Sequence, residues 1–194
     1  AEAGVAKAVV NVHYLADALD AHLAKRGGGP AIALSDERDL LLETGGGMVK
    51  AHGQGMLPDP FFCLNSDNVW LDGPRDIFRE LSDGWDAARM DALLMLVRHP
   101  QAHNYDGQGD FRLDPLGRVS RRLPGRIAPY VFTGIQLVSH RLRRDAPQGP
   151  FSTDVLWNRA IAEGRLFGMV HTGHWFEVGT PQAIRPTEEI LSRG

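Results

Sequence analysis

Cysteine is nearly absent from this 194-residue chain, since Cys63 is its only one, and an intrachain disulfide is therefore excluded. Cys63 lies in the apolar run FFCLN (Phe61 to Asn65), where we expect a small buried thiol rather than a reactive one. Long apolar runs are also absent: no stretch approaches the roughly 18 residues of a membrane-spanning helix, and no signal peptide opens the chain. We therefore expect a cytoplasmic protein without a membrane partner.

The chain also lacks an excess of positive charge. Its 21 lysines and arginines stand against 24 aspartates and glutamates, for a formal net charge of -3, which argues against nucleic acid as a partner. One local basic cluster is expected to be a solvated face or loop rather than an anion site: Arg118, Arg121, Arg122 and Arg126. With 43% hydrophobic and 23% charged residues, the composition predicts a globular protein with one well-filled core.

Several motifs of common enzyme classes are missing. There is no G-x-x-x-x-G-K-[ST] sequence and no G-x-S-x-G sequence, so neither a P-loop protein nor a serine hydrolase of the elbow type is indicated. The eight histidines include two close pairs, His99 with His103 and His171 with His174, but neither pair has a partner at a zinc-binding spacing. We expect these to be ordinary surface or core histidines.

The first residues, AEAGVAKAVVNV, do not begin with methionine, and Ala1 to Ala3 resemble the last turn of a helix capped by Gly4. A helix end with nothing before it suggests that an N-terminal segment is missing from this chain.

Short apolar runs alternate with helical periodicity through the first half. Such near-continuous apolar strands predict a parallel sheet covered by helices on both faces. The expected strands are 8–12, 31–34, 61–65 and 92–97, and the expected helices cover 15–23, 48–53 and 76–81. The second half is richer in β-structure: a hairpin in GDFRLDPLGRVS (109–120), strands at 129–139, 166–172 and 175–178, and helices at 154–163 and 181–191. We expect one α/β domain over residues 1–194.

Three consecutive glycines, Gly45 to Gly47, separate a strand-like segment from the helix expected at Met48. Glycine costs backbone entropy and has no side chain to pack, so this run is either a loose linker or a backbone that something approaches closely. Because a strand and a helix flank it closely, we favour the close approach.

Two acidic residues stand at the ends of predicted strands. Asp67 follows FFCLN, with Asn65 two residues before it on the same side of an extended chain, and Glu177 lies in WFEVGTP. Carboxylates converging from distant strands suit Mg²⁺, which prefers oxygen ligands shared with phosphates. The pattern alone favours a simpler reading, an Asx-turn for Asp67 and a surface position or an arginine partner for Glu177.

Four stretches in this order resemble one family: LLETGGG (41–47), FFCLNSD (61–67), YVFTGI (130–135) and WFEVGTP (175–181). Together they are similar to the sugar-1-phosphate nucleotidyltransferases, most of all to N-acetylmuramate-1-phosphate uridylyltransferases and mannose-1-phosphate guanylyltransferase-like proteins. The likeness covers essentially the whole chain. It implies a Rossmann-like mixed, mainly parallel sheet flanked by helices, and the transfer of a nucleotidyl group from a nucleoside triphosphate to a sugar-1-phosphate with release of pyrophosphate.

The resemblance also implies roles for particular residues. Asp67 matches the catalytic, metal-binding aspartate, and Glu177 matches the second metal-binding carboxylate, so Mg²⁺ is the expected cofactor. The nucleoside would be bound by Glu43, Gly45, Gly46 and Asn65, with base and ribose against the glycine backbone. The sugar pocket would be lined by Gly109, Thr133 and Gly134.

The chain departs from the family pattern in two ways. The family has Asp where this chain has Glu177, which is one methylene longer. The signature G-x-G-x-R-x-x-P loop and the P-K-P lysine are absent, and they belong to a first strand and loop that precede this chain. We therefore expect the chain as printed to have little transferase activity. Mannose-1-phosphate guanylyltransfer and a non-catalytic sugar- or nucleotide-binding domain of the same fold stay open as alternatives.

Overall fold

The computed structural model describes residues 4–192, and the chain divides into two compact units. The first comprises the residues up to Phe61 together with His140–Ala160, and the second comprises Phe62–Ser139 and the residues from Ile161 onward. The helical turn expected at Ala1 to Ala3 lies outside the described residues. A single catalytic domain over residues 1–194 stays a prediction.

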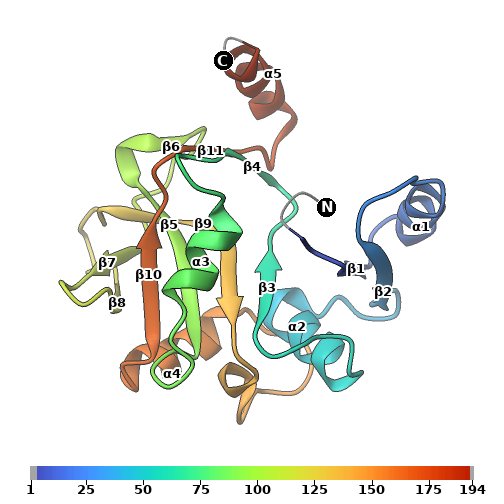
Figure 1. Ribbon diagram of the computed structural model, residues 1–194, viewed down its shortest axis with the longest axis horizontal. Coiled ribbons are helices and arrows are strands. Elements are labelled where there is room, and N and C mark those ends of the chain that lie inside the picture. Colours follow the sequence, from blue (N-terminus) through green and yellow to red (C-terminus); the bar gives the residue numbers. More distant parts are fainter. Residues whose placement is uncertain (1–3, 193–194) are drawn as a thin grey trace. The chain divides into compact units, whose positions relative to one another are not determined.

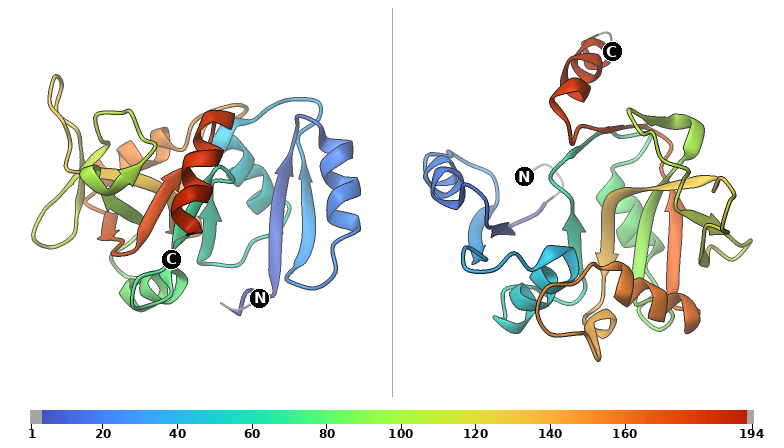
Figure 2. Two further views of the ribbon diagram at one scale, coloured as in Figure 1. Left: turned by 90° about the horizontal axis from the view of Figure 1, so that it is seen from above. Right: turned by 180° about the vertical axis from the view of Figure 1, so that it is seen from behind.

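The first unit contains a parallel strand pair with its crossover helix. β1 (Lys7–Val12) pairs with β2 (Ala31–Asp36), and α1 (Ala16–Ala24) connects the two strands. Figure 2 shows α1 beside this pair. Parallel strands need such a crossover because their ends lie at opposite edges of the pair. The two strands and the helix expected from the sequence are confirmed.

Helix α2 (Glu43–Gly53) begins five residues earlier than expected, so the prediction of a glycine loop followed by a helix from Met48 is wrong. All three glycines, Gly45 to Gly47, lie inside α2 and are buried. Glycine is a poor helix former, and packing within the unit must therefore account for the helix in this segment.

That packing is a close approach of two stretches of backbone. A Cβ added to Gly45 would lie 2.8 Å from the carbonyl oxygen of Phe151, and one added to Gly46 would lie 2.5 Å from that of Gly149. The amides of Gly45 and Gly46 both donate to the Phe151 carbonyl, at 2.9 and 3.2 Å. The expected close approach to these glycines therefore exists, and the chain's own 149–151 segment makes it.

The second unit contains a mixed sheet in the order β10-β5-β9-β7-β8, with β3 also paired to β9 (Figure 1). Strand β10 is parallel to β5, whereas β9 is antiparallel to both β5 and β7. We expected a mainly parallel sheet, and this sheet contains more antiparallel strand pairs than that expectation implies. The strands are β3 (Phe61–Leu64), β5 (Ala92–Arg98), β7 (Phe111–Leu113), β8 (Val119–Arg121), β9 (Tyr130–Val138) and β10 (Leu166–Val170).

Helix α3 (Ile77–Gly84) packs on this sheet. The Asp76 carboxylate caps it by accepting a hydrogen bond from the Arg79 amide at 2.9 Å. Its buried side chains, Ile77 and Leu81, join one apolar cluster with buried residues of the strands and of the segment before β5. Those are Met90, Leu93, Met95, Ile135, Leu137 and Phe167.

A small second sheet in the same unit has the order β4-β11-β6. β11 (His174–Glu177) lies in its centre, antiparallel to β4 (Asn68–Leu71) and parallel to β6 (Ala102–His103). The expected strand around 175–178 and the final helix, α5 (Pro181–Leu191), are confirmed. The remaining elements are α4 (Asp154–Ala162) and the 3-10 turns η1 (His99–Gln101) and η2 (His140–Arg143).

Among the described residues, 4–192, none of the helices has the length and apolar character that crossing a bilayer requires.

Candidate functional site

The small sheet of the second unit brings Asp67 and Glu177 together. Asn68, the first residue of β4, pairs with Glu177, the last residue of β11. The ladder continues one step further, because the Val178 amide donates to the Asp67 carbonyl at 2.8 Å. The backbones of Asp67 and Glu177, which are distant in the sequence, therefore lie one step apart on neighbouring segments of this sheet.

Electrostatics at Glu177 reflect this crowding of negative charge. Its pKa is raised, first by burial and then by the charges of Asp67, Asp110 and Asp106. Repulsion of this kind disfavours the ionised form, and a cation placed between the carboxylates would relieve it. Within residues 4–192 no group of three or more His, Cys, Asp or Glu side chains is arranged to hold a metal ion. The pair alone fits Mg²⁺ that takes its other ligands from water and phosphate.

Gly134 determines how closely the Asp67 segment approaches the large sheet. It has a φ of +81° within β9, at a point where the register with β5 shifts. A Cβ here would lie 2.2 Å from Asn68 Nδ2 and 2.9 Å from Asn65 Cβ. The Asn65 amide donates to the Gly134 carbonyl at 2.8 Å. Glycine thus allows the chain between β3 and β4 to lie directly against β9.

Thr133 uses its polar groups inside the protein. Its hydroxyl donates to the Met95 carbonyl at 2.8 Å, its carbonyl accepts from Trp175 Nε1 at 2.8 Å, and the residue is fully buried. The hydroxyl therefore stabilises the irregular part of the β5–β9 pairing. A sugar-binding role for Thr133 stays a prediction, and the side chain is committed to the sheet.

Gly109 lies just before β7 with a φ of +74°, and a Cβ there would be 2.4 Å from the Ala128 carbonyl. Its neighbour Asp110 was missed by the sequence reasoning. The Asp110 carboxylate accepts from the Phe132 amide at 2.8 Å and from the Tyr105 hydroxyl at 3.4 Å. It therefore ties the Gly109 turn to β9 next to Thr133. The available signal was an acidic residue directly after a glycine at the start of the expected hairpin, 109–120.

The remaining predicted nucleotide-binding residues lie in different units. Asn65 belongs to the second unit, whereas Glu43, Gly45 and Gly46 belong to the first. Glu43 is exposed and has a φ of +59° at the start of α2. The nucleotide-binding role of all four residues stays a prediction.

Glu37 is a second residue that the sequence reasoning missed. It is 4% exposed and accepts hydrogen bonds from Asn11 Nδ2 and, at 3.2 Å, from the Leu42 amide. Its carbonyl oxygen lies 2.7 Å from His13 Nδ1. This buried carboxylate fixes the segment that leads into α2. The only sign of its importance in the sequence was its position in the charged stretch DERD, shortly before the glycine run.

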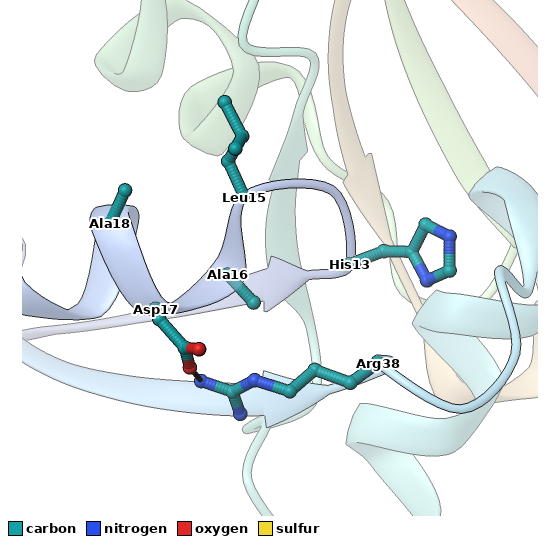
Figure 3. Close-up of a pocket in the computed structure, with 6 residues that line it drawn as sticks. All are labelled: His13, Leu15, Ala16, Asp17, Ala18 and Arg38. Carbon is teal, nitrogen blue, oxygen red and sulfur yellow. Dashed lines mark hydrogen bonds and ion pairs between the residues drawn. The ribbon is translucent and has the colours of Figure 1, made fainter.

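The first unit also has a surface pocket of about 410 Å³ at the start of α1, drawn in Figure 3. Its lining includes His13, Asp17 and Arg38. The Arg38 guanidinium donates to Asp17 Oδ1 at 2.8 Å and to Asp36. The Arg38 amide, with help from the guanidinium, lowers the pKa of Asp36. Because its cation is already paired with two carboxylates, the pocket offers little to an anionic ligand.

The chain is similar over nearly its whole length to a curated protein. That protein is the N-acetylmuramate alpha-1-phosphate uridylyltransferase of Caulobacter vibrioides, which is 40% identical over 194 aligned residues, covering 98% of this chain and 79% of that protein. No protein-family model matches the chain.

Solved structures show the same fold at low sequence identity. HddC from Yersinia pseudotuberculosis has a TM-score of 0.74 at 17% identity, over 98% of this chain and 80% of that chain. UDP-glucose pyrophosphorylase, in a complex with UDP-glucose, has a TM-score of 0.75 at 7% identity, over 100% of this chain and 83% of that chain. The mixed α/β fold is therefore the one that we expected from the sequence.

Proposed function

Because the chain belongs to the sugar-1-phosphate nucleotidyltransferases, as its relationship to the Caulobacter protein shows, we propose that it transfers the uridylyl group of UTP to N-acetylmuramate-1-phosphate. Enzymes of this class join a nucleotide to a sugar-1-phosphate and release pyrophosphate. The name of the 40% identical relative supports this choice of base and sugar. In the proposal the product is a UDP-sugar of peptidoglycan recycling, made in the cytoplasm.

The observation that carries the proposal is the backbone pairing of Asp67–Asn68 with Glu177–Val178, which places the Asp67 charge near enough to help raise the pKa of Glu177. These two carboxylates would hold Mg²⁺. When bound, the ion would neutralise phosphate charge as the sugar phosphate oxygen attacks the α-phosphorus and the bond to pyrophosphate breaks. Glu177 is one methylene longer than the aspartate of the family pattern, and its backbone position beside Asn68 keeps its carboxylate near Asp67.

Other residues of the chain would orient the substrates. The backbone around Gly109 and Gly134 would face the sugar, with Asp110 holding the first of these turns against β9. The start of α2 at Glu43 to Gly46 would face the nucleoside. The Gly45 and Gly46 amides already donate hydrogen bonds to the Phe151 carbonyl. A base would therefore have to contact other backbone or side-chain groups at the start of α2.

Assays of pyrophosphate release test the substrate choice. We would compare the printed chain with a version extended by the G-x-G-x-R-x-x-P loop of the family, using UTP and GTP against N-acetylmuramate-1-phosphate and mannose-1-phosphate. We expect turnover of UTP with the muramate sugar, mainly in the extended version. Turnover of GTP with mannose-1-phosphate would support the guanylyltransferase instead. Tight binding of UTP by calorimetry, without turnover in the extended version, would support a non-catalytic binding domain.

A further inference from the structure

Asn104, in the loop between β6 and β7, links the strand end at Glu177 to helix α5. Its Nδ2 donates to the Glu177 carbonyl at 3.1 Å and to Thr187 Oγ1 at 2.9 Å. Thr187 is a buried residue of α5, and its hydroxyl donates in turn to the Ala183 carbonyl at 2.8 Å. A single amide group therefore bonds two elements that lie 73 and 83 residues away in sequence.

The side chain of Asn104 continues a strand ladder that its backbone has left. β6 and β11 pair through Ala102 with Trp175 and His103 with Phe176, so the next pair in line would be Asn104 with Glu177. Instead Asn104 has a φ of +61°, which turns its backbone out of the sheet. The amide side chain then supplies the hydrogen bond that the backbone no longer makes.

Two requirements meet at this position, and asparagine satisfies both. The left-handed backbone favours glycine, asparagine or aspartate. The Glu177 carbonyl and the Thr187 hydroxyl need two donated protons from one short side chain, which an amide nitrogen provides. Aspartate would place an acceptor against the carbonyl, and glycine would leave that carbonyl without this donor.

The backbone of Glu177 is consequently held from both neighbouring strands. On one side, Asn68 pairs with it and the Val178 amide donates to the Asp67 carbonyl. On the other side is the Asn104 amide. Strand ends fray unless such contacts hold them, and Glu177 is the last residue of β11.

We propose that Asn104 is a positioning residue, which fixes the end of β11 and with it the backbone that carries the Glu177 carboxylate of the proposed cation site. This inference rests on the proposed function for the identity of the cation site. Its structural part, that Asn104 immobilises the Glu177–Val178 backbone, does not depend on any activity.

Three variants separate positioning of Glu177 from simple docking of α5. Asn104→Gly keeps the left-handed backbone and removes the side-chain amide. Asn104→Asp keeps the size and shape of the side chain but replaces the donating NH₂ group with a carboxylate oxygen, which accepts. Thr187→Val removes the Asn104 bond to α5 and the bond from Thr187 to the Ala183 carbonyl inside that helix, leaves the bond to Glu177 in place, and is the matched control. Each would be checked for a cooperative thermal transition, so that a failure to fold is recognised.

Hydrogen exchange of the Val178 amide in the metal-free chain is the first measurement. We expect exchange about tenfold faster in both Asn104 variants, the effect of losing roughly one hydrogen bond, and within about twofold of the parent chain in Thr187→Val. Equal exchange in the parent chain and the Asn104 variants would overturn the inference.

Binding of Mn²⁺ in the presence of UTP, followed by electron paramagnetic resonance, is the second measurement, with Mn²⁺ standing in for Mg²⁺. It uses the chain extended by the G-x-G-x-R-x-x-P loop, with and without each substitution. We expect several-fold weaker binding in the Asn104 variants and no change in Thr187→Val. Unchanged Mn²⁺ affinity alongside faster exchange would overturn the link to the cation site. Failure of the extended chain with Asn104 intact to bind Mn²⁺ with UTP would contradict the proposed function instead, and the exchange data would then decide the role of Asn104 alone.

Discussion

Gly134 is a residue whose replacement should disturb the candidate site directly. Gly134→Ala places a methyl group on a backbone with a φ of +81° and 2.2 Å from Asn68 Nδ2. We expect a loss of about 2–4 kcal/mol in unfolding free energy, of which roughly 1 comes from the backbone and the rest from the collision. Gly164→Ala is the matched control, because its φ is +66° and nothing lies within 4 Å of the added methyl. Equal losses in urea titrations of the two variants would contradict this explanation.

Cys63 should be unreactive in the folded chain. Burial raises the pKa of its thiol to about 11, although a hydrogen bond with Gln136 acts in the opposite direction. At pH 8 the thiolate that attacks alkylating and disulfide reagents is therefore scarce. We expect labelling by a colorimetric disulfide reagent at pH 8 only after denaturation. Rapid labelling of the native chain would show that the thiol is accessible and normally ionised.

His52 should make stability depend on pH. Its Nδ1 is buried without a hydrogen-bond partner among residues 4–192, its Nε2 accepts from Arg143 Nε at 3.3 Å, and its ring lies edge-on to His140. Burial first, then the charges of His140 and Arg143, lower its pKa below the usual 6.5. Between the lowered pKa and 6.5 the unfolded chain binds more protons than the folded one, so stability falls as pH decreases through that window.

The test for His52 compares melting temperatures between pH 5 and pH 8. The parent chain should lose stability below pH 6.5, and His52→Gln should flatten that part of the curve. His13→Gln is a control on an exposed histidine of the same unit. Identical pH profiles of the parent chain and His52→Gln would exclude His52 as the source.

At the scale of elements, strand and helix positions could largely be predicted because they follow from local apolar patterns. β1, β2, β5 and β9 contain short apolar runs, and all four lie where we expected. β4 could not be found in this way, since NVWL is short and directly follows the polar sequence Asn65-Ser66-Asp67. Its pairing with β11 is what makes it a strand.

The start of α2 could not be predicted because long-range contacts override local propensity there. Three glycines argue against a helix, but the 149–151 segment accepts the amides of Gly45 and Gly46 and allows no side chain at either position. Similarly, the register shift between β5 and β9 depends on the unusual backbone of Gly134. Neither effect has a periodic signal in the sequence.

Two glycines of α2 allow the effect of long-range packing to be measured against that of helix propensity. Gly46→Ala gains up to about 1 kcal/mol of helix propensity, but its methyl would lie 2.5 Å from the Gly149 carbonyl. We expect net destabilisation of about 1–3 kcal/mol. Gly53→Ala, at the last position of the same helix with nothing within 4 Å, should be neutral or stabilising by less than about 1 kcal/mol. Thermal melts that rank the two variants in the opposite order would contradict the packing argument.

At the scale of the whole molecule, the candidate site depends on a pairing of strands that are distant in the sequence, and local sequence patterns cannot predict such a pairing. The sequence singled out Asp67 and Glu177 separately, and the family resemblance suggested that they act together. The structure adds that the Asp67–Asn68 backbone pairs with the Glu177–Val178 backbone at the ends of β4 and β11. Asp110 and Asn104 were not predicted, because their importance comes from hydrogen bonds to residues distant in sequence.

Replacing either carboxylate should separate activity from stability. Asp67→Asn and Glu177→Gln should each lower the turnover of the extended chain by about 100-fold or more, because they remove charge that a bound cation would need. Their melting temperatures should not fall, since each removes repulsion from a crowded site. The control is Asp83→Asn, at an exposed surface carboxylate paired with Arg75. A drop in stability with activity retained would indicate a structural role for the pair.

The pairing of β4 with β11 also has a consequence for how the protein folds. β4 and β11 are joined by the chain from residue 71 to residue 174, and all strands of the large sheet except β3 lie within that interval. Closing so long a loop is entropically costly before any contact repays it, whereas hairpins such as β7–β8 close quickly. We infer that the large sheet assembles first and that the small sheet closes late. The cation site would then be among the last parts of the second unit to form, and a chain that is compact and spectroscopically folded could still lack it.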